Sequence, residues 1–330
     1  MRVFITGGSG SIGRNLCRLL LERGDSPVVL SRRAAALRAK DVAPGVTWVQ
    51  GDPMLAGDCA RGLDGCDAVV NLAGENLFGA RWDSNVRRLI RDSRVFSTGN
   101  VIAAVAAAKN PPKTLVQASA IGFYGPRGDD EIDESTNAGS DFLAETCQAW
   151  ENAASSVKEL GTRLATVRIG VVLARDEGAL GVMTPIFKWL PGGAAPVGSS
   201  HPLAPALGKG WLSWIHMDDI VGILLLALDS PSATGPINGT APEPERNAGF
   251  GRALAEAVWR PFLPIGPPDA LLKLILGEVA EVITCSQRVK PKRALELGYQ
   301  FKYPNLSLAL ADLFASKRKS QSNQAPKATR

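Results

Sequence analysis

The first thirteen residues, MRVFITGGSGSIG (1–13), join a predicted strand to a predicted helix through a glycine-rich turn. RVFIT (2–6) is an apolar run typical of a buried strand, and residues 11–23 carry apolar side chains at helical spacing. Glycines at such a junction allow a tight turn and a close approach of the backbone to a pyrophosphate, which the helix N-terminus attracts. The sequence therefore predicts a dinucleotide site that includes Gly7, Gly10, Ser11, Ile12 and Gly13.

Apolar strands and helices alternate through the first half of the chain. Strands are predicted at 2–6, 26–31, 46–50, 67–74, 113–120 and 162–173, and helices at 11–23, 83–108 and 140–160. Strands that are apolar throughout and are separated by helices indicate a parallel sheet covered on both faces. The predicted fold class is α/β, a Rossmann-type doubly wound parallel sheet with a smaller C-terminal α+β domain on the substrate side.

The character of the chain changes after residue 173. Glycine and proline become dense over 191–210, which is predicted to be a long loop. Shorter elements are predicted beyond it, namely helices at 217–228, 247–258, 268–280 and 305–315 and strands near 211–216 and 236–240. We therefore expect a nucleotide-binding domain at 1–173, a substrate-side domain at 174–315 and a basic disordered tail at 316–330.

Composition excludes several classes of partner. The formal charge of +5 is accounted for by five basic residues within 316–330, which leaves 32 basic and 32 acidic residues elsewhere. We therefore expect no nucleic acid and no membrane as partner. Five cysteines without a CxxC pair, together with only two histidines, predict no metal site. No signal peptide precedes the first strand and no apolar run is long enough to span a bilayer, so a cytoplasmic location is expected.

The residues at the end of the second predicted strand indicate whether the bound nucleotide is NAD or NADP. An Asp or Glu at this place accepts the ribose 2′-OH of NAD, but the stretch SPVVLSRR (26–33) has Ser31 followed by Arg32. A hydroxyl beside a guanidinium binds a 2′-phosphate, so NADP(H) is the predicted cofactor. Asp52 is placed to meet the adenine edge, and the turn Leu72, Ala73 and Gly74 after the fourth strand is placed beside the cofactor.

Several further motifs together resemble one family. They are TGGSGSIG (6–13), NLAGENLFGARW (71–82), RDSR (91–94), SAIGFYG (119–125), WIHMDD (214–219) and QRVKPKRALELGYQFKYP (287–304). The family is that of the atypical extended short-chain dehydrogenases/reductases described as NAD-dependent epimerase/dehydratase-like, some of which carry a cell division inhibitor label. The resemblance covers nearly the whole chain to about residue 315. It implies a Rossmann domain, NADP(H) binding and a small C-terminal substrate-side domain, and leaves the substrate undefined.

The same resemblance shows that the usual catalytic residues are altered. Ordinary extended members carry a Ser or Thr and a YxxxK helix, in which the Tyr transfers a proton and the Lys holds the nicotinamide ribose. Here Leu143 occupies the Tyr position and Cys147 the Lys position, and no YxxxK occurs in the chain. Ala120 occupies the place of the strand hydroxyl, with Ser119 one residue earlier.

Three residues are candidates for substitute catalysis. Tyr124 carries a hydroxyl at the end of the fifth strand, although a structural role in its loop is favoured over proton donation. Ser119 is equally suited to hydrogen bond a substrate carbonyl or to cap a turn. Cys147 lacks a His or Lys nearby in sequence to lower its pKa, so a small buried side chain is favoured over a reactive thiol.

Four residues are predicted to line a substrate pocket. Asn76 and Trp82 belong to the loop after the fourth strand, and Gln287 is placed to close the pocket from the C-terminal region. His216 lies where a strand passes into a helix, and a structural role is favoured over that of a general base. Among the arginines of the long helix, Arg87, Arg91 and Arg94 share one face, and one of them could reach a phosphate or carboxylate of a ligand.

Two functions remain open. The first is an NADP(H)-dependent oxidoreductase or epimerase that acts on a small polar metabolite with a rearranged proton relay. The second is a catalytically silent NADP(H)-binding regulatory or redox-sensing protein. The sequence favours the enzyme slightly, and a cavity of ligand size lined by Asn76, Trp82 and Tyr124 would support it. A homodimer is a further expectation.

Overall fold

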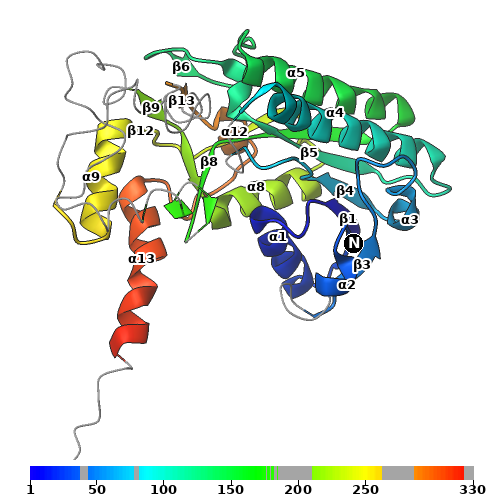
Figure 1. Ribbon diagram of the computed structural model, residues 1–330, viewed down its shortest axis with the longest axis horizontal. Helices are drawn as coiled ribbons and strands as arrows, with labels where there is room; N and C mark the ends of the chain where they lie inside the picture. The colour runs from blue at the N-terminus through cyan, green and yellow to red at the C-terminus, as the bar shows by residue number, and fades with distance from the viewer. Residues whose placement is uncertain are drawn as a thin grey trace, which may run out of the picture.

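A seven-stranded parallel sheet runs through the centre of the computed structural model (Figure 1). The structure describes residues 1–37, 44–77, 82–175, 177–178, 180–181, 184, 210–261 and 286–322. The strands are β1 (Arg2–Thr6), β2 (Ser26–Ser31), β3 (Thr47–Gln50), β4 (Ala68–Asn71), β5 (Thr114–Ala120), β7 (Arg163–Ile169) and β11 (Gly235–Gly239). Their order is β11-β7-β5-β4-β1-β2-β3, and every adjacent pair is parallel. The predicted doubly wound α/β class is confirmed.

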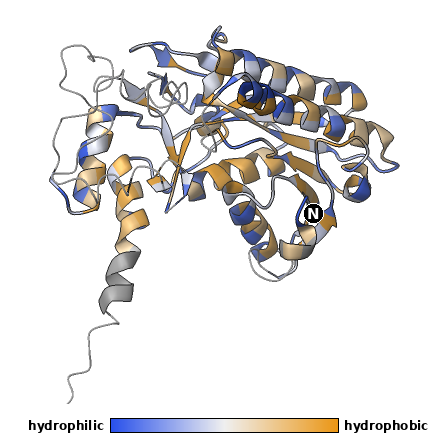
Figure 2. Ribbon diagram, in the orientation of Figure 1, coloured by the Kyte–Doolittle hydropathy of each residue, from blue (hydrophilic) through white to orange (hydrophobic). Residues whose placement is uncertain are grey.

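Helices cover both faces of this sheet (Figure 1). α1 (Ser11–Glu22) and α8 (Met217–Asp229) pack on one face, while α3 (Ala60–Leu63), α4 (Ser84–Ala107) and α5 (Phe142–Ser155) pack on the other. Successive residues of β1 point to opposite faces, so Val3 and Ile5 join the first core and Phe4 joins the second. Figure 2 shows the hydropathy pattern that follows from this burial. The strands are mostly hydrophobic, while the helices also carry hydrophilic residues.

Shorter elements connect the layers or follow them. They are α2 (Ala34–Leu37), the 3₁₀ helices η1 (Ile121–Tyr124) and η2 (Ser156–Leu160), β6 (Glu131–Ile132), β8 (Val171–Ala174), β9 (Trp211–Leu212), β10 (Trp214–His216), β12 (Glu245–Arg246), α9 (Asn247–Ala257), β13 (Arg288–Val289), α12 (Lys292–Glu296) and α13 (Leu306–Ser322). β8 pairs with β10, β9 with β12, and β6 with β13. A separate core joins β8, β10, α9 and α13, with Trp214, Phe250 and Leu310 buried in it.

Some sequence predictions need correction. The single strand predicted over 162–173 is broken at Gly170, where an added Cβ would lie 2.8 Å from the Ser213 carbonyl oxygen. β7 therefore stays in the main sheet while β8 pairs elsewhere. The strand predicted near 236–240 is β11, an edge strand of the main sheet rather than part of the smaller domain. Within the acidic stretch 129–134, Glu131 and Ile132 form β6, which pairs with β13.

The end of the chain differs as well. α13 continues to Ser322, into the segment 316–330 that was expected to be disordered, because its Ala, Lys, Arg and Gln residues favour helix. The predicted helix at 268–280, the predicted loop at 191–209 and residues 323–330 lie outside the described residues. The division of the chain into domains at residue 173 stays a prediction.

Candidate cofactor and active site

The glycine turn after β1 is held by close backbone approaches. Gly7 has a φ of +68°, and an added Cβ there would lie 2.6 Å from the Leu72 carbonyl oxygen. A Cβ on Gly13 would lie 2.5 Å from the Gly7 carbonyl oxygen, so no larger residue fits between the turn and α1. The Gly10 N–H donates to the same oxygen at 3.0 Å and Gly10 caps α1. The turn is therefore a cradle in which backbone atoms, rather than side chains, face a ligand.

The start of α1 offers unused donors to this cradle. Its first turn holds no acidic residue, and Gly10 provides no side-chain cap. The Ser11 hydroxyl is buried and has no hydrogen-bond partner in the described part of the chain. Ser11 and Ile12 both line the large cavity described below. Because helix N-termini bind phosphate oxygens, the loop fits the pyrophosphate of a dinucleotide.

The end of β2 lies beside this turn, since Leu30 pairs with Thr6. The Ser31 hydroxyl accepts the Arg33 N–H at 3.2 Å, and the Gln50 amide donates to the Arg32 carbonyl at 2.7 Å. These bonds fix the backbone of the loop and leave the Arg32 side chain exposed, with no ion pair to any described carboxylate. An exposed guanidinium at this place fits a 2′-phosphate.

The remaining predicted cofactor residues follow β3 and β4. Asp52 is half-buried, and its carboxylate accepts the Met54 N–H at 3.0 Å. The Ala73 N–H donates to the buried Thr6 hydroxyl at 3.2 Å, which ties the β4 turn to β1. Leu72 is half-buried and Gly74 is exposed. All of these residues lie at the carboxyl edge of the sheet, where open α/β sheets bind ligands.

A cavity of about 370 Å³ continues from the glycine turn. It lies between the ends of β5 and β7 and the segment that contains β9, and it is in the size range of small-molecule sites. Its lining includes Ser11, Ile12, Asn76, Arg94, Ala120, Asp141, Thr146, Cys147, Gly170, Trp211 and Gln287. The cavity therefore joins the predicted cofactor loop to the end of β5.

The predicted pocket residues divide into two groups. Asn76 and Gln287 line this cavity, and the Gln287 amide donates to the Ile121 and Gly125 carbonyl oxygens at 3.0 Å each. Trp82 is not among the lining residues that the structure describes. It is buried, donates from Nε1 to the Leu77 carbonyl oxygen at 2.9 Å and packs edge-on against Phe142. Trp82 therefore packs behind the residues that line the cavity.

His216 lies at a second cavity, of about 420 Å³. Its Nδ1 accepts the Asp218 N–H at 3.1 Å and caps α8, and its Nε2 lies 3.4 Å from an Asp312 carboxylate oxygen. Burial lowers the pKa of His216, with the nearby carboxylates opposing this shift. Ser11 lines both cavities. Among the described residues, however, Cys147 lines the first cavity and His216 lines the second, so the structure does not bring these two side chains together.

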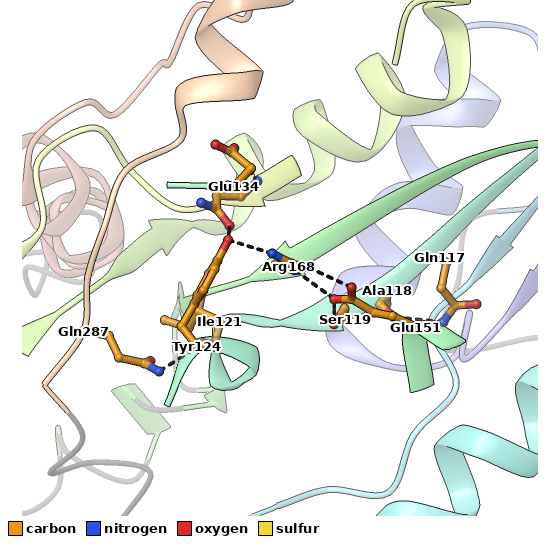
Figure 3. Close-up of polar contacts among 10 residues, drawn as sticks. Gln117, Ala118, Ser119, Ile121, Tyr124, Glu134, Glu151, Arg168 and Gln287 are labelled. Atoms are coloured by element: carbon orange, nitrogen blue, oxygen red, sulfur yellow. Dashed lines mark hydrogen bonds and ion pairs between the residues drawn. The ribbon is translucent and has the colours of Figure 1, made fainter. Parts of the chain in front are cut away.

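A buried polar network lies behind the first cavity (Figure 3). The Ser119 hydroxyl donates to Glu151 Oε1 at 2.7 Å, and Arg168 binds both carboxylate oxygens of Glu151 at 2.9 Å. Arg168 also donates to the Tyr124 hydroxyl at 3.0 Å, and that hydroxyl donates to Asn238 Oδ1 at 2.7 Å. The ion pair between Glu151 and Arg168 thus connects the Ser119 hydroxyl to the Tyr124 hydroxyl.

Burial makes two of the candidate groups weak acids. It raises the pKa of Tyr124 to about 12, and Tyr124 is fully buried and outside the described lining of the cavity. Burial also raises the pKa of Cys147 to about 12, so its thiol is protonated at neutral pH. Cys147 lines the cavity and lies within reach of the Ser119 hydroxyl. The structure therefore places Cys147 in the cavity wall and Ser119 next to it, whereas Ser119 and Tyr124 are both buried outside the described lining of the cavity.

Sequence reasoning missed several members of this network. Glu151, Arg168 and Asn238 were not proposed as site residues, although a cation inside a buried apolar strand, as at Arg168, is an unusual pattern. Arg94 was only one of three arginines on a helix face. Among the described residues, no cluster of acids, cysteines and histidines could hold a metal ion. No described helix combines the length and apolarity needed to cross a membrane.

Comparisons with known proteins place the chain in a family. The model of the NAD dependent epimerase/dehydratase family matches residues 3–238, and that of a domain of unknown function (DUF1731) matches residues 267–313. The chloroplastic SDR39U1 homolog of Arabidopsis thaliana, an epimerase family protein, is 38% identical over 94% of this chain and 86% of its own. Epimerase family protein YfhF of Bacillus subtilis is 34% identical over 96% of this chain and 99% of its own.

A solved structure agrees with these relatives. Human epimerase family protein SDR39U1 (isoform 2), crystallised with NADPH, is 33% identical, covers 96% of this chain and 99% of its own, and has a TM-score of 0.80. These matches extend over nearly the whole chain. The chain belongs to the NAD dependent epimerase/dehydratase family.

Proposed function

We propose that the chain binds NADP(H) along the carboxyl edge of the sheet and is an oxidoreductase or epimerase that acts on a small polar metabolite. The glycine cradle, the unpartnered Ser11 hydroxyl and the exposed Arg32 support the cofactor. The human relative crystallised with NADPH supports it as well. The cofactor, when bound, supplies or accepts a hydride.

The observation that carries the enzyme proposal is the cavity of about 370 Å³. It begins at the cofactor loop and continues past Cys147 to Trp211 and Gln287, so a small second ligand can lie beyond the part that the nicotinamide half would occupy. Asn76 and Gln287 provide amide groups that can orient a polar substrate.

Proton handling is proposed to rest on Ser119 and Glu151. Arg168 binds both oxygens of Glu151 and stabilises the carboxylate, which accepts a hydrogen bond from the Ser119 hydroxyl at 2.7 Å. Ser119 is only 2% exposed and lies outside the described lining of the cavity, so a substrate hydroxyl would have to reach it past Cys147. When that hydroxyl is oxidised, its proton is proposed to pass to Ser119 Oγ while the Ser119 proton moves to Glu151. The protonated Cys147 thiol, which lines the cavity, is proposed to donate a hydrogen bond to the reacting oxygen.

A catalytically silent NADP(H)-binding protein is the alternative. It is favoured by the absence of the YxxxK pair and by the high pKa of Tyr124 and Cys147, because an efficient general acid has a pKa near the working pH. A cytoplasmic location, a homodimer and the absence of nucleic acid or membrane partners also stay predictions. A measurement of substrate turnover therefore distinguishes the enzyme from the catalytically silent protein.

The first test is calorimetric titration with NADPH and with NADH. We compare the wild type with Arg32→Ala and with Arg88→Ala, a control that removes an exposed arginine from α4. NADPH is expected to bind about 10- to 100-fold more tightly than NADH, and Arg32→Ala is expected to lose most of this preference. If neither nucleotide binds, the proposal is contradicted.

A second experiment tests turnover. Carbonyl compounds are screened as substrates whose reduction oxidises NADPH, with wild type and with Ser119→Ala.

A further inference from the structure

The second cavity, of about 420 Å³, is built from α1, the start of α8, the end of β8 and α13. α1 and α8 lie side by side on one face of the sheet (Figure 1). The described lining is mostly polar and includes Arg14, Arg18, Arg175 and His216. A cavity with this lining suits a charged ligand rather than an apolar one.

Two buried nitrogen atoms of this lining have no hydrogen-bond partner in the part of the chain that the structure describes. His216 is 3% exposed and its Nδ1 accepts the Asp218 N–H, so in the neutral ring Nε2 carries the hydrogen and is a donor. Arg175 donates from Nε to the Leu313 carbonyl oxygen at 2.7 Å, which leaves its Nη2 as a second donor without an acceptor. A buried donor without an acceptor costs about 1–3 kcal/mol. A ligand that brings acceptors would remove this cost at both atoms.

The carboxylates of the lining do not supply these acceptors. Glu177 accepts from Arg14 at 2.6 Å, and the Asp218 carboxylate lies 3.6 Å from Lys302 Nζ. The Asp312 side chain is 52% exposed, and its oxygen lies 3.4 Å from the histidine Nε2 without forming a hydrogen bond. Solvent screens the charge of such an exposed carboxylate.

The cations of the same lining are less completely paired. Arg18 binds Glu22, which lies outside the described lining of the cavity. Arg175 forms no ion pair with any carboxylate among the described residues. The guanidinium group of Arg175 therefore keeps a donor and an unpaired charge at the wall of the cavity.

We propose that the second cavity binds a small anion with several acceptor oxygens, a phosphate or carboxylate group, through Arg175 Nη2 and His216 Nε2. Guanidinium groups bind such oxygens through charge-assisted hydrogen bonds. Ser11, Ala174 and Met217 line both cavities, so the anion site adjoins the proposed cofactor groove without being part of it. The proposal does not rest on NADP(H) binding.

Calorimetric titration with inorganic phosphate and with citrate tests the site, and the two anions distinguish a phosphate group from a carboxylate group. Wild type is compared with Arg175→Gln and with His216→Asn, which change the two unpartnered donors. Arg91→Gln, at an exposed position of α4, is the matched control. Thermal unfolding without ligand shows whether each variant is folded.

At least one of the two anions is expected to bind wild type with a Kd of about 1 mM or lower. Arg175→Gln should weaken this binding by about 10- to 100-fold and His216→Asn by about 3- to 10-fold, while Arg91→Gln should change it by less than about twofold. Asp312→Asn should strengthen binding, because it removes a negative charge from the wall. If wild type binds neither anion, or if folded Arg175→Gln and His216→Asn bind as wild type does, the proposal is overturned.

The glycine turn is another place where an anion would bind, and NADPH separates the two places. Binding in the second cavity should persist when NADPH is saturating. An anion that NADPH displaces and that Arg175→Gln does not affect lies at the glycine turn, and this result would also overturn the proposal. If wild type binds no NADPH, the proposed cofactor is contradicted, whereas the comparison of the variants still tests the anion site.

Discussion

The two ends of the proposed cofactor groove are built in different ways. At the β2 end, the glycine turn, Ser31 and Arg32 come from one continuous stretch of the chain, residues 6–33. At the β5 end, Arg94, Ser119, Cys147, Glu151, Arg168 and Asn238 come from α4, β5, α5, β7 and β11. The first end is a local motif, while the second exists only when distant elements pack together. Substitutions should therefore affect the two ends differently.

The largest effect is expected at the assembled end. Arg168→Gln leaves the Glu151 carboxylate without its bidentate partner, and the Arg168 side chain is only 5% exposed. Removal of one partner from a buried ion pair costs about 3–5 kcal/mol of unfolding free energy. Urea unfolding measures this loss directly.

Two controls define the result for Arg168. Arg18→Gln breaks the exposed Arg18–Glu22 pair and should cost less than about 1 kcal/mol. The double variant Arg168→Gln with Glu151→Gln should be more stable than Arg168→Gln alone, because no unpaired charge stays buried. If the double variant is the less stable one, the assembled end does not depend on this ion pair.

The same contrast explains what the sequence could predict. Strand and helix periodicity and the glycine turn are local patterns, and the fold class derived from them is correct. The break at Gly170 and the place of β11 depend on pairing partners far away in the sequence, so periodicity missed both. Tyr124 and Trp82 were expected in the cavity wall, but packing turned Tyr124 toward Arg168 and Trp82 toward Phe142. Arg94 could not be distinguished from its neighbours on α4.

The second prediction tests the local end. Gly13→Ala would place a Cβ 2.5 Å from the Gly7 carbonyl oxygen, so the turn or α1 must shift. We expect a loss of about 1–3 kcal/mol in unfolding free energy, measured by urea unfolding, together with weaker NADPH binding.

The matched substitution Gly99→Ala should have the opposite sign. An added Cβ on this exposed glycine of α4 would meet nothing within 4 Å, and alanine favours helix over glycine by about 0.5–1 kcal/mol. If Gly13→Ala is as well tolerated as Gly99→Ala, the close approach in the glycine turn does not exist in the protein.

The smallest effect is expected at His216, which sequence reasoning placed in the pocket and which lies at the second cavity. Burial lowers its pKa from the ordinary 6.5, so the unfolded chain takes up a proton more readily than the folded one. Stability should then fall as the pH drops below 6.5 and should be unaffected above it. Because Asn also caps helices, His216→Asn should remove this acid-dependent loss, of less than about 1 kcal/mol, without altering the affinity for NADPH. Urea unfolding between about pH 5 and 8 and calorimetry at neutral pH measure the two effects. A weaker affinity of His216→Asn for NADPH would place His216 in the cofactor site and break the separation between the two cavities.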